Sequence, residues 1–351
     1  MLNQRRNRSL PKATAILTDF NAVSFREVSL NVASILKKEG VKVGLYNLTA
    51  QKIREHNIIF VGNIFSLSIS YAQRFLPEHN LIFYAITEGI PMLDSMSHKL
   101  SENITYITPS QYTKQCLEQA RLNVTAVIPH GINLNNEYDK NFHDRIKQGI
   151  PQPSKVEPSN IMLCVAGNWR RKALDKLLIG YKTVEKIMKD AFLILHTGIG
   201  DTNIVHLQEM LELKRMWFTN LWGTLPSDKL ASLYKLSDIY IQPSMVEGFG
   251  LTYLEAFRWN KPVIGVDCPA TNELVKDGYT GVLIPVIKTE DILWQDRHAI
   301  RLHYFSVNDL IDAILLLCDE KVRARLATNI EKEKKRWNME KTYKKFLEWL
   351  E

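Results

Sequence analysis

The stretch that decides the fold is "IQPSMVEGFGLTYLEAF", residues 241–257. Its first residues end the apolar, β-branched run "DIYIQPS" (238–244), which predicts a buried strand. The run "LTYLEAF" predicts a helix that begins near Leu251. Between strand and helix, Gly248 and Gly250 let the backbone turn sharply and approach a ligand closely. The free N–H groups and positive dipole end of such a helix bind anions, so the pattern predicts a phosphate site.

Two glutamates, Glu247 and Glu255, flank this glycine turn. Glu255 lies in the first turns of the expected helix, where a carboxylate can accept hydrogen bonds from both hydroxyls of a ribose. Glu247 precedes the turn and would face whatever group extends beyond the phosphate. Each acid alone also has a simpler interpretation, because Glu255 could complement the helix dipole and Glu247 could be a solvated loop acid. The two acids together with the strand, glycine turn and helix favour a binding function.

The second feature is basic and lies in "VAGNWRRKALDKLLIGY", residues 165–181. Arg170, Arg171 and Lys172 stand where a helix is expected to begin after a strand. Each cation at a helix N-terminus costs roughly 0.3–1 kcal/mol, and a bound anion would reverse that sign. Arginine grips phosphate oxygens in a bidentate way and lysine adds a point charge. A solvated basic turn is the alternative interpretation.

Outward from these motifs, strand patterns alternate with helical patterns along the chain. The strand patterns are short, rich in β-branched residues and bounded by turn residues, at 14–20, 41–47, 57–63, 81–87, 104–110, 124–131, 160–168, 191–198, 215–223, 238–244, 261–267 and 281–286. The helical patterns include 25–40, 173–189, 203–212 and 226–236. The pattern fades over the polar, proline-containing stretch 133–160, whose end we interpret as an interdomain linker. The chain is therefore predicted to be α/β, with two doubly wound domains and a cleft between them.

This ordered set of motifs resembles the retaining glycosyltransferases of family 4, "glycosyl transferases group 1", which have the GT-B fold. The resemblance rests on "EGFGLTYLE" (247–255), which matches the family's E-x7-E motif, and on "VIPHGIN" (127–133), "GNWRRK" (167–172) and "LWGTLPSDKLASLYKLSDIYIQPS" (221–244). It implies two Rossmann-like domains facing a central cleft. The implied divisions are an acceptor-side domain at 1–150, a donor-side domain at 151–330 and a C-terminal helix at 331–351 that crosses back to the N-terminal domain.

The resemblance also implies an activity: transfer of a sugar from a nucleoside-diphosphate-sugar, such as a UDP- or GDP-sugar, to an acceptor hydroxyl with retained configuration. By position, Glu255 would bind the donor ribose and Glu247 the donor sugar, while Arg171 and Lys172 would hold the diphosphate. The backbone N–H donors would come from Gly248, Phe249, Gly250, Leu251 and Thr252, and the loop that contains Gly223 would lie near the base. No divalent metal is then required, and the sequence contains no D-x-D pair.

The N-terminal half departs from the family pattern in two places. The loop after the first strand reads "DFNAVSF" (19–25), without the usual glycine pair. Many members have a histidine at the cleft end of a middle N-terminal strand, where this chain has Glu88 in "FYAITEGIP" (83–91). Glu88 could orient the acceptor or stabilise positive charge at the anomeric carbon, or it could simply cap a turn. His130 is interpreted as structural, and the segment 288–306 as an insertion without an assigned role.

Composition and charge limit the remaining possibilities. Cys116, Cys164, Cys268 and Cys318 share no CxxC spacing, which disfavours a zinc site or disulfide framework and favours a reducing compartment. The net charge is +7, with +4 in residues 1–12 and +5 in residues 321–351, which leaves −2 for the rest. Basic ends indicate solvated tails or peripheral contact with an anionic membrane, and disfavour nucleic acid. We expect a cytoplasmic protein, since no apolar run reaches about 18 residues and no secretory signal is evident.

Three classes of function remain open from the sequence. The first is the retaining, metal-independent glycosyltransferase, with a glycan, lipid or protein as acceptor. The second is another GT-B enzyme, a nucleotide-sugar epimerase or phosphorylase. The third is a non-catalytic binding protein with basic termini, which would have no need of the two acidic and basic sets described above.

Overall fold

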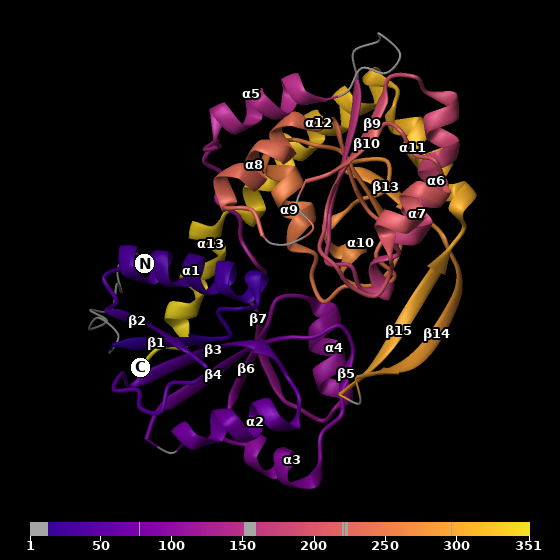
Figure 1. Ribbon diagram of the computed structural model, residues 1–351. Coiled ribbons are helices and arrows are strands. Elements are labelled where there is room, and N and C mark those ends of the chain that lie inside the picture. The colour runs from indigo at the N-terminus through magenta and orange to yellow at the C-terminus, as the bar shows by residue number, and fades with distance from the viewer. Residues whose placement is uncertain (1–12, 77, 151–158, 220, 222–223, 296) are drawn as a thin grey trace, which may run out of the picture. The chain divides into compact units, whose positions relative to one another are not determined.

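The computed structural model describes residues 13–76, 78–150, 159–219, 221, 224–295 and 297–351. The chain divides into two compact units (Figure 1). The first unit contains the residues up to Gly131 together with Leu293–Ile300 and Trp337–Glu351. The second contains Ile132–Ile292 and Arg301–Arg336.

The first unit is built on a six-stranded parallel sheet with strand order β2-β1-β3-β4-β6-β7. The strands are β1 (Thr14–Thr18), β2 (Val43–Asn47), β3 (Asn57–Asn63), β4 (Asn80–Ile86), β6 (Thr105–Thr108) and β7 (Val124–Val127). β1, β3 and β4 are buried over nearly their whole length. That burial explains their continuous apolar sequences, because helices cover both faces of a parallel sheet.

Helices lie on both sides of this sheet, with α1 on one side and α2 and α3 on the other (Figure 1). The helices of this unit are α1 (Val23–Lys38), α2 (Ser66–Ala72), α3 (Ser95–Ser101), α4 (Gln111–Gln119) and α13 (Met339–Tyr343), with short 3-10 segments η1 (Gln73–Phe75) and η4 (Lys344–Glu348). α13 packs against α1, and Tyr343 and Phe346 are fully buried. The predicted return of the C-terminal segment to the N-terminal domain is therefore confirmed, although short α and 3-10 turns replace one continuous helix.

The second unit has its own six-stranded parallel sheet, with order β10-β9-β8-β11-β12-β13. Its strands are β8 (Asn160–Val165), β9 (Ala191–His196), β10 (Met216–Phe218), β11 (Ile239–Gln242), β12 (Val263–Val266) and β13 (Gly281–Ile284). Its helical segments are α5 (Lys140–Gly149), η2 (Arg170–Lys172), α6 (Leu174–Ile187), α7 (Ile204–Met210), α8 (Ser227–Leu236), α9 (Leu251–Arg258), α10 (Thr271–Leu274), α11 (Val307–Leu317) and α12 (Glu320–Glu333), followed by η3 (Lys334–Trp337). Two doubly wound α/β domains are thus present, as predicted.

The segment around 133–150 differs from its sequence-based description. It contains α5, whose Asp139 N-cap accepts a hydrogen bond from the backbone N–H of Phe142 at 2.9 Å. α5 packs on α8, and Ser232 of α8 donates to the carbonyl of Asp139 at 2.9 Å. These contacts group residues 132–150 with the second unit, whereas the division implied by the family resemblance placed residues up to 150 in the first domain.

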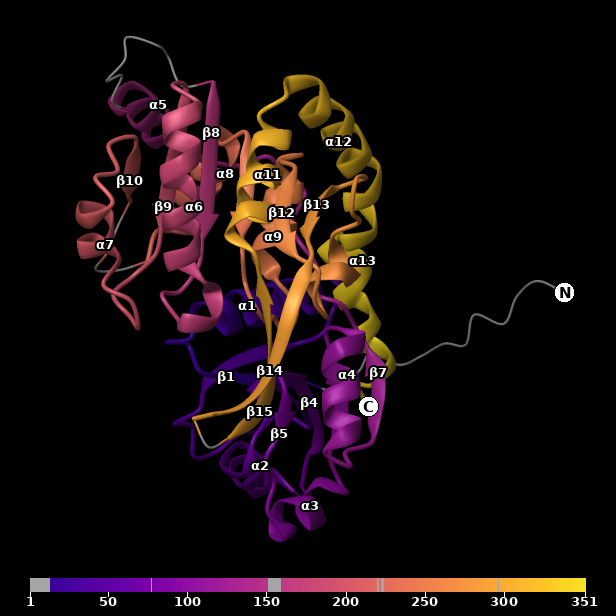
Figure 2. The ribbon, with the colours of Figure 1, turned by 90° about the vertical axis from the view of Figure 1, so that its right-hand side faces the viewer.

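The unassigned insertion 288–306 is a long β-hairpin, which Figure 2 shows from the side. Its strands are β14 (Val286–Trp294) and β15 (His298–Phe305), and β15 pairs antiparallel with β5 (Ile90–Pro91) in a three-stranded sheet. The tip, Leu293–Ile300, belongs to the first unit.

Two expectations about the whole chain can be compared with the structure. All four cysteines are free thiols, which agrees with the predicted lack of a disulfide framework. Within the part of the chain that the structure describes, no helix has the length and apolar character to span a bilayer. The basic segment 1–12 lies outside the described residues.

Candidate functional site

The strand order of the second unit indicates where a ligand would bind. Counted within this sheet, the order is 3-2-1-4-5-6, so the winding reverses between β8 and β11, which pair directly. Ligands of open α/β sheets bind beyond the carboxyl ends of the strands at such a reversal. The two predicted motifs follow these two strands: the basic turn follows β8, and the acid-glycine turn follows β11.

The basic turn after β8 is a short 3-10 helix, η2, that ends in a strained residue. Ala173 follows it with φ +50°, a left-handed conformation, and begins α6. The carbonyl of Arg171 accepts a hydrogen bond from the backbone N–H of Met245 at 2.8 Å. The basic turn and the loop after β11 are therefore held together by their backbones, which places Lys172 against the acidic motif.

Glu247 is buried, with 5% of its surface exposed, and it forms an ion pair with Lys172. The same carboxylate oxygen, Oε1, also accepts a hydrogen bond from Nε2 of Gln242. Burial raises the pKa of Glu247, but the charges of Lys172 and Arg171 and the hydrogen bond from Lys172 outweigh burial, so the pKa lies below its ordinary value. The carboxylate is therefore ionised at neutral pH.

Gln242, the last residue of β11, is a site residue that the sequence patterns did not single out. Its side-chain oxygen accepts hydrogen bonds from Tyr240 Oη at 2.7 Å and from Thr252 Oγ1. Its backbone carbonyl accepts a hydrogen bond from Tyr253 Oη at 2.9 Å. Because Gln242 also donates to Glu247, this one amide connects the strand, the acid and the first turn of α9. A lone glutamine in a strand carries no sequence signal for that role.

Helix α9 begins at Leu251, as the sequence predicted, and Gly250 is its N-cap. Gly250 has φ +96°, and a Cβ there would lie 2.6 Å from Cδ2 of Tyr253. Glycine is therefore required for both conformation and space. Further along α9, Glu255 accepts a hydrogen bond from Tyr234 Oη at 2.7 Å. Burial, together with the charge of Glu255, raises the pKa of Tyr234 well above its usual value, so the phenol stays a donor.

The structure thus brings Lys172, Glu247 and Thr252 into one hydrogen-bonded network through Gln242. Glu255 has a different partner, Tyr234. The remaining predicted backbone positions, Gly248, Phe249 and Leu251, form the turn and helix start beside this network, and Phe249 is itself buried. Gly223 lies outside the described residues.

Two predicted residues belong to the first unit. Glu88 follows β4 and is half-buried, and its backbone carbonyl accepts a hydrogen bond from Tyr112 Oη at 2.9 Å. His130 is 1% exposed, and its Nδ1 lies 2.8 Å from Tyr84 Oη. Burial lowers the pKa of His130 to about 3, so the imidazole is neutral. This packing agrees with the structural role predicted for His130.

Comparison with known proteins relates this chain to glycosyltransferases. Residues 146–297, which include both motifs of the second unit, match the family model for glycosyl transferases group 1. An uncharacterized glycosyltransferase of Sulfolobus islandicus rod-shaped virus 1 is 25% identical over 355 residues, covering 95% of this chain and 99% of the viral protein. An uncharacterized glycosyltransferase of Methanocaldococcus jannaschii is 26% identical and covers 67% of this chain and 56% of its own length.

Solved structures show the same fold at low sequence identity. Anabaena HepE in complex with UDP and glucose aligns with a TM-score of 0.69 at 14% identity, covering 96% of this chain and 98% of HepE. Sucrose-phosphate synthase from Thermosynechococcus elongatus aligns with a TM-score of 0.71 at 17% identity, covering 95% and 97% of the two chains. The fold is that of the GT-B glycosyltransferases. Together with the match to the family model, these findings make the protein an enzyme of the glycosyltransferase class, and residues 146–297 are similar to the group 1 family.

Proposed function

We propose that this protein is a retaining, metal-independent glycosyltransferase of family 4 that moves a sugar from a nucleoside-diphosphate-sugar to an acceptor hydroxyl. The observation that carries the proposal is the buried network of Lys172, Glu247, Gln242 and Thr252 at the winding reversal of the second sheet. A buried ion pair rarely adds stability over apolar side chains of similar volume. Its location, beside a helix N-terminus at a binding position, is better explained by a ligand.

In the proposed reaction the basic turn stabilises the departing diphosphate. Negative charge develops on the diphosphate as the bond to the sugar breaks, so fixed cations near it lower the barrier. Lys172 and Arg171 are the cations of this turn, and α9 contributes N–H groups and its positive dipole end. Glu247 holds the Lys172 ammonium in place and would accept hydrogen bonds from the donor sugar. Glu255, oriented by Tyr234, would accept them from the ribose.

The first donor to test is a UDP-sugar, with GDP-sugars second. Anabaena HepE, which shares this fold, was crystallised with UDP and UDP-glucose. The pneumococcal O-GlcNAc transferase GtfA, which aligns with a TM-score of 0.59, was crystallised with UDP and GlcNAc. Because cationic side chains and a helix N-terminus can balance the diphosphate charge, the proposal requires no divalent metal.

The proposed location is the cytoplasm, with peripheral contact to anionic membranes through the basic ends of the chain. The acceptor would be a glycan, lipid or protein. In the C-terminal segment, Lys344 pairs with Glu39, so one of its cations already has a carboxylate partner. We expect membrane contact to depend mainly on residues 1–12, which carry four basic residues and no acid. Co-sedimentation with phosphatidylserine vesicles, compared with phosphatidylcholine vesicles and a chain lacking residues 1–12, tests this proposal.

The enzymatic test is release of nucleoside diphosphate from UDP-glucose, UDP-GlcNAc and GDP-mannose in the presence of EDTA and a mixed glycan acceptor pool. Mass spectrometry of the products separates transfer from epimerisation or phosphorolysis. Glu247→Gln and Lys172→Met should each lower kcat by roughly 100- to 1,000-fold, the usual cost of losing one transition-state contact. Glu209→Gln, on the exposed surface of α7, is the matched control.

Wild-type turnover in both Glu247→Gln and Lys172→Met would contradict the proposed site. Turnover that disappears with EDTA and returns with Mg²⁺ would contradict metal independence alone. An inverted anomeric configuration in the product, read by NMR, would contradict the retaining assignment alone.

A further inference from the structure

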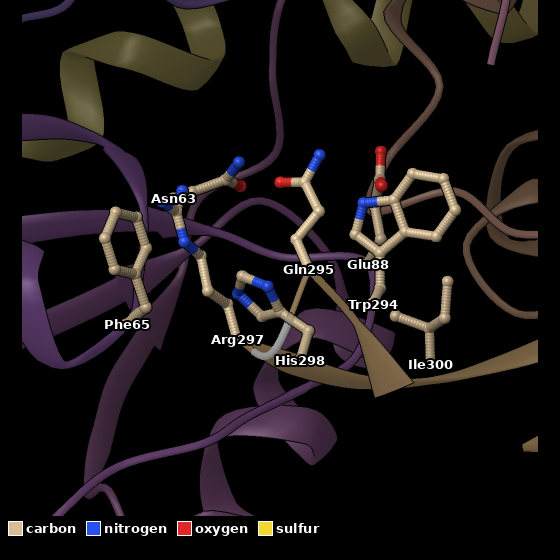
Figure 3. A pocket seen from close by; sticks show the side chains of 8 residues that line it. All are labelled: Asn63, Phe65, Glu88, Trp294, Gln295, Arg297, His298 and Ile300. Atoms are coloured by element: carbon tan, nitrogen blue, oxygen red, sulfur yellow. The ribbon is translucent and has the colours of Figure 1, made fainter. Parts of the chain in front are cut away.

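The tip of the β14–β15 hairpin forms one wall of a small pocket in the first unit (Figure 3). The other wall comes from the end of β3 and from residues that follow β3 and β4. The pocket is lined by Asn63, Phe65, Glu88, Trp294, Gln295, Arg297, His298 and Ile300. The carboxyl ends of parallel strands are where α/β sheets place ligands, so the hairpin completes a binding position of this sheet.

The hairpin tip is hydrogen-bonded to the rest of the first unit. The backbone N–H of Met92 donates to the carbonyl of Arg297 at 2.7 Å, and Nε2 of His298 lies 2.8 Å from the carbonyl oxygen of Ile64. Gly89 leaves the backbone of Ala299 room to approach, since a Cβ at Gly89 would lie 2.3 Å from its carbonyl oxygen. The pocket wall is therefore preorganised, which reduces the entropy cost of binding.

Three pocket residues, Trp294, Gln295 and Arg297, come from this tip. The backbone N–H of Arg297 donates a hydrogen bond to the carbonyl of Trp294 at 3.0 Å. The guanidinium of Arg297 lies over the ring of Phe65, 4.7 Å from its centroid, which fixes the orientation of its donors. Figure 3 shows the side chains of Gln295, Glu88 and Trp294 among those that line the pocket.

The pocket lining combines an aromatic surface with neutral and charged groups that donate or accept hydrogen bonds. The amides of Asn63 and Gln295 donate and accept, the carboxylate of Glu88 accepts, and the guanidinium of Arg297 donates. Sugar hydroxyls also donate and accept, and the C–H face of a sugar ring packs on the electron-rich face of an indole. The negative charge of Glu88 repels a phosphate or a carboxylate of a ligand. A neutral polyol can instead donate hydrogen bonds to Glu88 and accept them from Arg297.

We propose that this pocket binds a neutral sugar residue of the acceptor, so that the enzyme glycosylates an existing carbohydrate chain or glycoside. The inference rests on the proposed function and identifies its acceptor class. Trp294 packs against the sugar ring, while Glu88 and Arg297 hydrogen-bond its hydroxyls. The hairpin then helps to select the acceptor, which gives a role to the segment 288–306.

The test is binding of the full-length protein to an array of immobilised neutral and acidic oligosaccharides. The wild type should retain a defined set of neutral glycans. Trp294→Ala and Glu88→Gln should each weaken that binding at least about tenfold, as expected for a central aromatic anchor and a charged hydrogen-bond acceptor. Trp294→Phe should recover part of the loss. Leu293→Ala is the matched control, because Leu293 neighbours Trp294, is 55% exposed and does not line the pocket.

Melting temperatures of all variants should match that of the wild type, which shows that lost binding is not lost folding. Absence of neutral glycan binding by the folded wild type would overturn the inference, as would equal binding by Trp294→Ala and Leu293→Ala. Exclusive binding of acidic glycans would contradict the neutral sugar. Calorimetry with UDP on the same samples separates the two proposals. UDP binding without glycan binding contradicts only the acceptor pocket, and glycan binding without UDP binding contradicts only the donor site.

Discussion

Lys172 and Glu247 form a buried ion pair, although 75 residues separate them along the chain. Their side chains are only 11% and 7% exposed. The pair exists because β8 and β11 are neighbours in the sheet, so the loops that follow these strands meet. The charge that the enzyme is proposed to use on a diphosphate is therefore positioned by the acid proposed to bind the sugar.

Removing one member of this pair should destabilise the protein. Lys172→Met leaves the Glu247 carboxylate buried without its cation, and we expect the free energy of unfolding to fall by about 3–5 kcal/mol. Urea denaturation measures this loss. Lys186→Met, at an exposed position of α6, should change stability by less than about 0.5 kcal/mol.

The double variant Lys172→Met, Glu247→Gln should recover part of the lost stability, since no uncompensated charge remains. In Lys172→Met alone, burial should raise the pKa of Glu247 above its unfolded value. The destabilisation should then shrink as the pH falls and the carboxylate takes up a proton. A constant difference between variant and wild type across pH 4–8 would show that the pair is not electrostatically coupled.

The stability of the first unit should depend on pH through His130. Its pKa in the folded protein is about 3 against an ordinary value of 6.5, so between these values the unfolded chain binds more protons. Stability should therefore fall as the pH is lowered from 6.5 towards 3, by up to about 1.4 kcal/mol per pH unit. His298, in the same unit, also has a pKa lowered by burial and contributes with the same sign. His196 and His303 have pKa values lowered by burial and act with the same sign on the second unit, to which they belong.

The contribution of His130 to this pH dependence is measured by comparing the free energy of unfolding at pH 7 and pH 5 in the wild type and in His130→Asn. This variant keeps a polar partner for Tyr84. The variant should lose less stability between the two pH values. His206→Asn, at an exposed position, is the control and should follow the wild type. An identical pH dependence in all three proteins would contradict a buried neutral imidazole.

Gly250 should resist substitution more strongly than another glycine with positive φ. Ala at position 250 meets both an unfavourable φ and the Tyr253 ring at 2.6 Å. Ala at position 278 meets only the unfavourable φ of +65°, with nothing within 4 Å of its Cβ. Gly278→Ala should cost about 1–2 kcal/mol of unfolding free energy, and Gly250→Ala should cost more. Equal costs would show that the start of α9 adapts without strain.

Gln242 should influence the pKa of Glu247, to which it donates a hydrogen bond. Gln242→Glu places a second carboxylate beside Glu247, and like charges at close range raise a carboxyl pKa. Because the proposed reaction needs Glu247 ionised, the acid limb of the pH–rate profile should move to higher pH. A merely structural role for Gln242 would lower kcat without moving that limb.

Central strands such as β1, β3, β8 and β11 could be predicted because they are buried on two faces and therefore continuously apolar. β10 is the weakest case: of the predicted run 215–223, the strand covers Met216–Phe218, and residues 220, 222 and 223 lie outside the described residues. α5 was missed because its few apolar residues, such as Phe142 and Ile146, stand in a strongly polar segment. Asp139, three residues before Phe142, was the available sign of a helix start.

The site could be predicted only as separate motifs. Glu247, Lys172 and Gly250 stand in patterns that carry their own chemistry, so each was identified from its neighbours in sequence. Gln242 acquires its role from contacts with side chains of three elements, which no local pattern contains. The hairpin tip is a similar case, since Trp294 becomes a pocket residue only through the pairing of β15 with β5.

The most direct test of the central claim is isothermal calorimetry of UDP, GDP and ADP with the wild type and with Lys172→Met and Glu255→Gln, all in EDTA. The account predicts that one diphosphate binds the wild type without metal. Lys172→Met should lose affinity for both the diphosphate and the matching monophosphate. Glu255→Gln should retain the contribution of the diphosphate but lose discrimination between ribose and deoxyribose. Failure of every nucleotide to bind the folded wild type would contradict the account.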